Sequence, residues 1–266
     1  MIKVIVCGGC GKMGSTVARL IYQDNSLELA GIIESPAHPQ NQKDWGMTVG
    51  LGNTGIMVQD DLEKIIQNAE QVVEFSNPQA SLQHLEIAVK YKKTMIIGTT
   101  GFSTEEMEKI NQLAQDIPFL LSPNMSLGVN LLFKLVTEAV AILSDDYDIE
   151  IIEAHHRFKR DAPSGTAKKL AQIIAQAKGA KLNEVAIYGR EGIVGERRRG
   201  EIGIHSLRGG DIAGEHTVLF TTLGESLELT HRAHSRDTFA YGTLQAIKFM
   251  QGKPAGFYTM KDVLKI

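Results

Sequence analysis

A glycine-rich turn between a predicted strand and a predicted helix limits the possible folds of this chain more than any other feature. The apolar strand Ile2–Val6 leads into the run Cys-Gly-Gly-Cys-Gly-Lys-Met-Gly at residues 7–14, and an amphipathic helical pattern follows as far as Gln23. Small residues at such a turn let the backbone bend sharply and approach a pyrophosphate, while the N-terminus of the helix supplies positive potential. The pattern therefore predicts a strand–turn–helix unit that binds a dinucleotide.

An acidic residue stands where such a unit needs one. The second predicted strand, Leu27–Ile33, ends at Glu34, which lies 20 residues after Gly14. A carboxylate at this place binds a ribose hydroxyl of the dinucleotide. A glycine turn can also serve packing alone, but the strand before it, the helix after it and the carboxylate of Glu34 together favour the dinucleotide site.

Strands and helices alternate through the rest of the first half. The stretch Ser35–Asn53 contains several Gly and Pro breaks and is predicted to be a long surface excursion. The predicted strands that follow are Gly55–Val58, Gln71–Ser76, Thr94–Ile97 and Ile117–Leu121, and the helices between them are Asp60–Gln67, Pro78–Lys92 and Thr104–Gln115. This alternation is typical of the α/β class and predicts a doubly wound, mostly parallel, Rossmann-like nucleotide-binding sheet.

Ligands of doubly wound sheets bind at the carboxyl ends of the strands. Besides the glycine turn, this rule selects the loops that begin at Phe75, Gly98 and Ser122. The residues predicted to bind the cofactor are Gly8, Gly9, Cys10, Gly11, Lys12, Met13, Glu34, Gly98, Thr99, Thr100, Ser122, Pro123, Asn124 and Met125.

The order of elements changes after Ser126. The remaining predicted elements are helix Leu127–Leu143, strand Asp148–Ala154, helix Thr166–Lys178, strands Glu201–Leu207, Glu215–Thr222 and Glu225–Ala233, helix Thr238–Gln251, and a short terminal element at Thr259–Leu264. Strands in series with short turns predict a smaller α+β domain with a mixed or antiparallel sheet. We expect residues 1–126 and 237–266 to form the dinucleotide-binding domain, to which the tail returns, and residues 127–236 to form a domain for substrate binding and oligomerisation.

A polar junction, Glu153–Ala167, joins the first strand of the second domain to the helix after it. Its candidate functional residues are His155, His156, Lys159, Ser164, Gly165 and Thr166. With a serine as N-cap, the next backbone N–H groups can bind a carboxylate or phosphate. An ordinary capped helix after a charged turn is the alternative, but two imidazoles and an ammonium group beside an anion site favour a substrate pocket. Neighbouring residues on a strand point to opposite sides, so the two histidines are a poor chelating pair and no metal is predicted.

Composition excludes several classes of partner. The net charge of -3 gives no electrostatic reason to expect nucleic acid or an anionic membrane as a partner. No apolar run approaches the roughly 18 residues of a membrane span, and we expect a cytoplasmic protein. The basic run Arg197–Arg199, in a loop predicted to be mobile, is expected to be solvated or to face a small anion. Cys7 and Cys10 form a Cys-x-x-Cys pattern, for which a redox dithiol is the alternative to two small residues at a tight turn.

These motifs together resemble the family of 4-hydroxy-tetrahydrodipicolinate reductases (dihydrodipicolinate reductases) over essentially the whole chain. The signature Glu-Ala-His-His-Arg-x-Lys-x-Asp-Ala-Pro-Ser-Gly-Thr is filled at every position. The matching segments are Gly8–Gly14, Gly98–Phe102, Asn124 with Gly128–Asn130, Glu153–Thr166, Gly209–Asp211 with Gly214–His216, and His231–Arg236.

The resemblance implies a reaction in the diaminopimelate route to lysine. In this family a nicotinamide delivers hydride to C4 of a cyclic unsaturated dicarboxylate after water has left, and a proton completes the reduction. By position, His155 resembles the proton donor and Lys159 the second catalytic group. The residues that resemble substrate contacts are His156, Gly165 and Thr166, with Ser164 beside them. Similar reductases are tetramers built through the sheet of the second domain, so we expect a homotetramer.

One departure from the family bears on the cofactor. Members that favour NADPH usually carry a basic residue after the acidic one, whereas this chain has Glu34-Ser35-Pro36. We therefore expect NADH to be used at least as well as NADPH, with Lys12 as the group that can still reach a 2′-phosphate. Two other functions stay open: a nicotinamide-sensing module, which needs no proton donor, and an amino-acid semialdehyde dehydrogenase, whose second domain is not expected to carry the polar junction.

Overall fold

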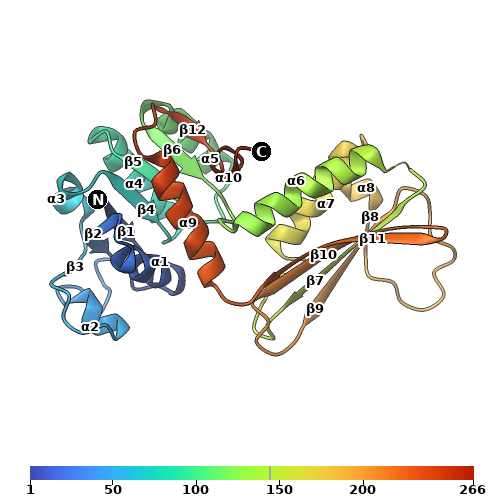
Figure 1. The fold of residues 1–266 in the computed structure, drawn as a ribbon, viewed down its shortest axis with the longest axis horizontal. Coiled ribbons are helices and arrows are strands. Elements are labelled where there is room, and N and C mark those ends of the chain that lie inside the picture. Colours follow the sequence, from blue (N-terminus) through green and yellow to red (C-terminus); the bar gives the residue numbers. More distant parts are fainter. Residues whose placement is uncertain (144) are drawn as a thin grey trace. The chain divides into compact units, whose positions relative to one another are not determined.

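The computed structural model describes residues 1–143 and 145–266 and divides them into two compact units. The first, the nucleotide unit, consists of Met1–Leu127 and Arg236–Lys265, and the second, the junction unit, consists of Gly128–Ser235 with Ile266. Figure 1 shows the helices and strands of each unit. Each boundary lies one residue from the predicted one.

The nucleotide unit is built on a seven-stranded sheet in which every neighbouring pair of strands is parallel. The order is β12-β6-β5-β4-β1-β2-β3. The strands are β1 (Ile2–Cys7), β2 (Leu27–Ile33), β3 (Val58–Gln59), β4 (Gln71–Glu74), β5 (Thr94–Ile97), β6 (Pro118–Leu121) and β12 (Gly256–Tyr258). The predicted Rossmann-like sheet is confirmed.

Both faces of this sheet are covered by helices. The helical segments are α1 (Lys12–Gln23), α2 (Trp45–Val49), α3 (Leu62–Ile65), η1 (Ile66–Asn68), α4 (Pro78–Lys90), α5 (Thr104–Leu113), η2 (Ala114–Asp116), α9 (Asp237–Met250) and α10 (Met260–Leu264). Along β1, Val4 and Val6 pack with α1 and α9 in one core, and Ile5 and Cys7 pack with α4 and α5 in another. Successive strand residues point to opposite faces, which explains why β1 reads as a continuous apolar run.

The C-terminal tail returns to the nucleotide unit, as predicted. Helix α9 packs against α1, and β12 pairs with β6 at the edge of the sheet, with Phe257 beside Phe119. The rings of these two residues meet edge to face at 5.2 Å. The sequence pattern did not predict β12, which is only three residues long.

The prediction of a long surface excursion at Ser35–Asn53 holds for most of the segment but not around Trp45. The segment contains α2, and Trp45 at its start is fully buried, with Nε1 donating a hydrogen bond of 3.0 Å to the carbonyl oxygen of Gly9. Asp44 caps the helix by accepting from the backbone N–H of Met47. Gly and Pro mark turns of the backbone, but they do not tell whether a side chain between two turns is exposed.

The junction unit contains a mixed five-stranded sheet of order β11-β10-β7-β9-β8. Its elements are α6 (Leu127–Ile142), β7 (Asp148–His155), α7 (Gly165–Ala177), α8 (Leu182–Val185), β8 (Ala186–Tyr188), β9 (Ile202–Arg208), β10 (Gly214–Thr222) and β11 (Glu225–Ala233). Strand β10 is antiparallel to β7 and β11, and the other pairs are parallel. The predicted α+β class is confirmed. Helices α6 and α7 pack on one face through a core that includes Ile151, Val218 and Phe220.

Candidate active site

Close backbone packing shapes the glycine turn. A Cβ atom on Gly8, whose φ is +73°, would lie 2.6 Å from the carbonyl oxygen of Phe75, and one on Gly14 would lie 2.0 Å from that of Gly8. Neither position accepts a side chain. Gly11 is the N-cap of α1 and offers no side chain to its first turn, so the backbone N–H groups there can bind a phosphate, and the turn fits a dinucleotide.

Glu34 is held against this turn. Its Oε1 accepts a 2.8 Å hydrogen bond from the backbone N–H of Cys10, and Trp45 fixes the neighbouring carbonyl of Gly9. The carboxylate that is predicted to bind the ribose therefore stands beside the predicted phosphate loop before any ligand arrives. Lys12 is exposed at the start of α1.

The other predicted cofactor loops follow β4, β5 and β6, which lie side by side in the sheet next to β1. Two of their buried side chains already have hydrogen-bond partners within the unit. Thr99 is buried and accepts from Ser81 at 3.0 Å, and Ser122 Oγ donates to the carbonyl oxygen of Asn124 at 2.8 Å. Met125 is buried in the core, so its backbone is the part that can contact a cofactor. Thr100 and Pro123 are exposed.

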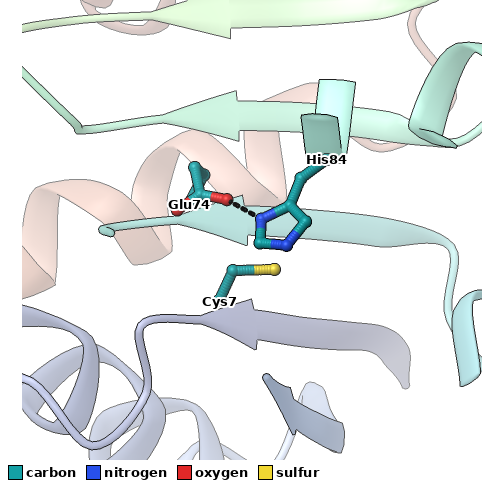
Figure 2. Close-up of side chains that lie close together, drawn as sticks. All are labelled: Cys7, Glu74 and His84. Carbon is teal, nitrogen blue, oxygen red and sulfur yellow. Dashed lines mark hydrogen bonds and ion pairs between the residues drawn. The ribbon is translucent and has the colours of Figure 1, made fainter. Parts of the chain in front are cut away.

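A buried cluster behind the glycine turn supports this edge of the sheet (Figure 2). The carboxyl group of Glu74 accepts from the backbone N–H of Ser76 at 2.8 Å, and its other oxygen lies 2.5 Å from Nδ1 of His84. With the sulfur of Cys7, these side chains place three potential metal ligands within 4.8 Å of one another. Both carboxyl oxygens already have protein partners, so we interpret the cluster as support for the loop after β4.

The two thiols do not suit a redox dithiol. Burial and then the carboxyl group of Glu74 raise the pKa of Cys7 well above its usual value. Burial and then Glu34 raise the pKa of Cys10 to about 11. Redox dithiols depend on a lowered thiol pKa, because the thiolate is the reactive form. The structure therefore disfavours the dithiol alternative.

In the junction unit, a buried carboxylate organises the end of β7. Glu153 is fully buried, and Arg208 donates two hydrogen bonds to it, at 2.9 and 2.8 Å. Burial alone would raise the pKa of Glu153, but hydrogen bonds, from Arg208 first, lower it to about 2. Glu153 is therefore a carboxylate at neutral pH, and its two oxygens bind Nδ1 of His155 at 2.5 Å and the backbone N–H of Ser164 at 3.1 Å.

The pair Glu153–His155 orients the predicted proton donor. Because Nδ1 of His155 is bound to the carboxylate, Nε2 is the ring nitrogen left for a substrate. Gly214 lies close to this nitrogen: a Cβ atom added to the glycine would be 3.1 Å from Nε2. Burial lowers the pKa of His155 and outweighs the opposing effect of Glu153. Burial therefore favours the neutral ring, whereas the carboxylate of Glu153 favours the protonated ring.

Lys159 is linked to the Glu153–His155 pair through Asp161 and Arg208. Its Nζ pairs with Asp161 at 2.8 Å, and its side chain is 21% exposed. Arg208, which binds Glu153, also donates to the carbonyl oxygen of Asp161 at 2.7 Å. One guanidinium group thus connects the loop of Lys159 with the carboxylate that holds His155.

The N-terminus of α7 is capped by Ser164, as predicted. Ser164 is the N-cap, and its Oγ accepts from the backbone N–H of Ala167 at 3.2 Å. A Cβ atom on Gly165 would meet nothing within 4 Å, so a ligand can approach its backbone N–H, next to that of Thr166. Ser164 itself is 1% exposed, which makes its hydroxyl less accessible than the prediction of a substrate contact assumed.

His156 lies apart from this hydrogen-bonded network. Its ring centroid is 6.3 Å from that of the exposed Phe158, and its Nδ1 is buried with no hydrogen-bond partner in the part of the chain that the structure describes. Neighbouring residues of an extended strand face opposite sides, which separates His156 from His155. Its role as a substrate contact stays a prediction.

Three members of the site were not predicted: Glu153, Arg208 and His216. His216 is 4% exposed; its Nε2 lies 3.0 Å from Ser164 Oγ, and its ring meets that of His155 edge to face at 5.2 Å. The period of two along β7 puts Glu153 on the same side as His155 and was the available signal. The other two come from β9 and β10, and only the folded sheet brings them to β7.

The basic run does not present three free arginines to an anion. Arg197 pairs with Asp148 at 2.5 Å and with Glu150 at 3.1 Å, and the exposed Arg199 lies 3.7 Å from Asp146. Arg197 therefore attaches its loop to β7, which corrects the expectation for this one arginine, whereas Arg198 and Arg199 are exposed to solvent as expected.

No helix among residues 1–143 and 145–266 is long and apolar enough to cross a membrane.

Comparisons with known proteins match nearly the whole chain to one family. A family model described as dihydrodipicolinate reductase, N-terminus, matches residues 2–125, and one described as dihydrodipicolinate reductase, C-terminus, matches residues 128–264. A relative named 4-hydroxy-tetrahydrodipicolinate reductase, from Syntrophus aciditrophicus (strain SB), is 49% identical over 264 residues, which cover 99% of this chain and 98% of the relative.

A second relative of that name, from Geobacter sp. (strain M21), is 45% identical and is matched over 99% of both chains. Among solved structures, the dipicolinate-bound dihydrodipicolinate reductase from Paenisporosarcina sp. TG-14 has a TM-score of 0.79 and 24% sequence identity, with 98% of each chain covered. This last likeness is one of fold.

Proposed function

The chain belongs to the dihydrodipicolinate reductase family, and from this premise we propose that it reduces 4-hydroxy-tetrahydrodipicolinate to tetrahydrodipicolinate with NADH or NADPH, in the diaminopimelate route to lysine. The product is a cyclic dicarboxylate. The observation that carries the proposal is the carboxylate–histidine pair Glu153–His155 beside the open N-terminus of α7.

The nucleotide unit holds the cofactor. The first-turn N–H groups of α1 bind its pyrophosphate and Glu34 its adenosine ribose. After water has left the 4-hydroxy substrate, the reduced nicotinamide, when bound, would supply the hydride for C4. The loops that follow β4, β5 and β6 complete the binding surface.

The junction unit holds the substrate and supplies the proton. The backbone N–H groups of Gly165 and Thr166 bind one carboxylate, because they carry the positive end of the helix dipole. The ammonium group of Lys159 neutralises negative charge on the substrate as electrons arrive. His155 then gives the proton from Nε2, while Glu153 holds Nδ1 and stabilises the ring in its protonated form.

The direct test is an assay of NADH and NADPH oxidation with substrate freshly made from pyruvate and aspartate semialdehyde. We expect turnover by the native chain, and a fall in kcat of roughly 10²–10⁴ for His155→Gln, which is the usual contribution of a general acid. Lys159→Met should be at least as damaging. Absence of oxidation with both cofactors would contradict the proposed reaction, and near-native kcat in both variants would contradict the assigned roles.

NADH is the cofactor used at least as well as NADPH. A 2′-phosphate would face the carboxylate of Glu34, and moving this side chain away would break its 2.8 Å hydrogen bond from Cys10. A hydrogen bond to a charged group contributes about 1.5–3 kcal/mol. The exposed ammonium of Lys12 offsets about 1 kcal/mol of this at most, so the balance favours the free ribose hydroxyls.

The protein assembles as a homotetramer through the face of the junction-unit sheet that α6 and α7 leave uncovered. The register of β7 with β9 places Ile152 and Leu207 on this face, and they are 39% and 51% exposed. Apolar side chains on an uncovered sheet face favour association with another copy.

A further inference from the structure

Four residues of the junction unit form a closed ring of contacts. Glu153 binds His155 through one oxygen and the backbone N–H of Ser164 through the other. The hydroxyl of Ser164 bonds to Nε2 of His216, and the ring of His216 lies against that of His155. The proposed proton donor and the cap of the anion-binding helix are therefore joined along two routes, one through Glu153 and one through His216.

The direction of the Ser164–His216 hydrogen bond follows from a count of partners. The Oγ atom of Ser164 already accepts from the backbone N–H of Ala167, and at 1% exposure its O–H needs an acceptor inside the protein. If the hydroxyl donates to Nε2 of His216, one buried group, the Nδ1–H of that ring, has no hydrogen-bond partner among the described residues. If Nε2–H donates instead, both the serine O–H and Nδ1 lack a partner among the described residues, and two unsatisfied buried groups cost more than one.

The charge of His216 agrees with this direction. Burial, and then the neighbouring His155, lower the pKa of His216 to about 3. The ring is therefore neutral at physiological pH, so one nitrogen is free to accept. A neutral ring also puts no additional positive charge beside His155.

We infer that His216 is a positioning residue for the proposed reaction: its Nε2 accepts a hydrogen bond from the hydroxyl of Ser164, and this bond fixes the N-terminus of α7, which binds the substrate carboxylate, relative to His155. The inference rests on the proposed function for the identity of the ligand, but the state of the ring does not depend on it. His216 itself touches neither substrate nor cofactor. It acts through the cap.

The first experiment measures the protonation state of the His216 ring directly. In the native protein, ¹⁵N chemical shifts of His216 should show a neutral ring with the proton on Nδ1 and none on Nε2, unchanged between pH 8 and pH 5. A proton on Nε2, or titration of the ring within this range, would overturn the inference whether or not the chain reduces the proposed substrate.

The second experiment separates positioning from simple support of the fold. The probe is pyridine-2,6-dicarboxylate, with its Kd measured by calorimetry on the complete protein, together with KM for substrate and for NADH. His216→Leu removes the acceptor, and loss of one hydrogen bond of about 0.5–1.5 kcal/mol corresponds to a rise in Kd of about 2- to 12-fold. His216→Gln, whose Oε1 can take the place of Nε2, should restore most of the affinity, and KM for NADH should stay unchanged in both variants.

A double-mutant cycle with Ser164→Ala completes the test. Both changes remove the same hydrogen bond. The Kd of the double variant for the probe should therefore be no higher than the Kd of whichever single variant binds the probe less tightly. Additive losses, native affinity in His216→Leu, or no recovery in His216→Gln would each overturn the inference. If His216→Leu does not fold, His216→Asn serves in its place, since its shorter side chain stays polar but does not reach Ser164 Oγ. If the native protein binds the probe but does not turn over the substrate, this contradicts the proposed reaction and not the inference about His216.

Discussion

At the scale of single residues, the surroundings of His155 set its chemistry. The ring is neutral more often than a free imidazole, because burial lowers its pKa, and Lys159 and Arg208 add positive charge nearby. A general acid works only while it carries its proton. Activity that depends on this proton is therefore lost as the pH rises through the lowered pKa.

Removing the charge of Lys159 should raise the pKa of His155. In Lys159→Met, one of the positive charges that disfavour a protonated ring is gone. NMR titration of the imidazole in the ligand-free protein should show His155 titrating below its ordinary value in the native chain and at a higher pH in the variant. Lys168→Met, which removes an exposed ammonium group from α7, is the control; an unchanged or lower pKa in Lys159→Met would contradict the electrostatic account.

A second prediction at this scale concerns the choice of cofactor. Ser35→Arg places a guanidinium next to Glu34, where a 2′-phosphate would lie, and should raise kcat/KM for NADPH relative to NADH by about tenfold, since a new charge-assisted bond contributes about 1.5–3 kcal/mol before its entropic cost. Ser35→Gln has similar bulk and no charge, and should change the ratio little. A native preference for NADPH of tenfold or more would show that Glu34 does not control the choice.

At the scale of elements, the sequence predicted the helix starts that are determined by local N-cap hydrogen bonds. The N-caps Asn77, Ser103 and Ser164 hold their helices through side-chain hydrogen bonds, and all three helices were predicted with starts within one residue. Short elements such as α2, α8, β8 and β12 were missed, because a few residues carry no period and tertiary contacts decide their state.

The same contrast applies to the site. His155, Lys159 and the cap of α7 lie within one continuous stretch, so the sequence alone could suggest them together. Arg208 and His216 reach Glu153 and Ser164 from strands more than 40 residues away along the chain, and no spacing rule predicts such contacts. The burial of Trp45 was missed for the same reason.

The last helix allows a test of an element away from both proposed binding sites. Thr259 and Asp262 form a capping box at the start of α10. Thr259→Ala should lower the free energy of unfolding by about 1 kcal/mol, because the start of α10 loses the hydroxyl that donates to Asp262 Oδ2 at 2.8 Å. Urea unfolding followed by circular dichroism would measure this, with Thr259→Ser, which keeps the hydroxyl, as control. A change in KM for NADH or substrate in the folded variant would mean that α10 does more than support the fold.

At the scale of the whole molecule, the two units differ in fold and in the chemical groups that they present to a ligand. The doubly wound nucleotide unit presents backbone N–H groups, and the mixed sheet of the junction unit presents ionisable side chains on one covered face. Its other face is left uncovered by α6 and α7. The assembly proposed above would cover it.

A charge on that open face should prevent assembly. In Ile152→Asp, a carboxylate takes the place of an apolar side chain that is 39% exposed, and burying it against another copy without a partner is costly. Sedimentation at micromolar concentration should show a tetramer for the native chain and smaller species for the variant. Ile142→Asp alters an equally apolar residue that is 80% exposed on α6 and should leave the tetramer intact. A native monomer would contradict the proposed assembly.

The hydrogen bond between Trp45 and Gly9 gives the protein a built-in optical probe. Trp45 is the sole tryptophan of the chain, and its indole is buried with Nε1 bonded to the glycine turn itself. Any shift of that turn changes the environment of the fluorophore, and indole emission overlaps the absorption band of a reduced nicotinamide. If the chain binds NADH as proposed, its docking should therefore be seen as quenching of intrinsic fluorescence, without substrate, turnover or an attached label, even in variants that have lost their proton donor.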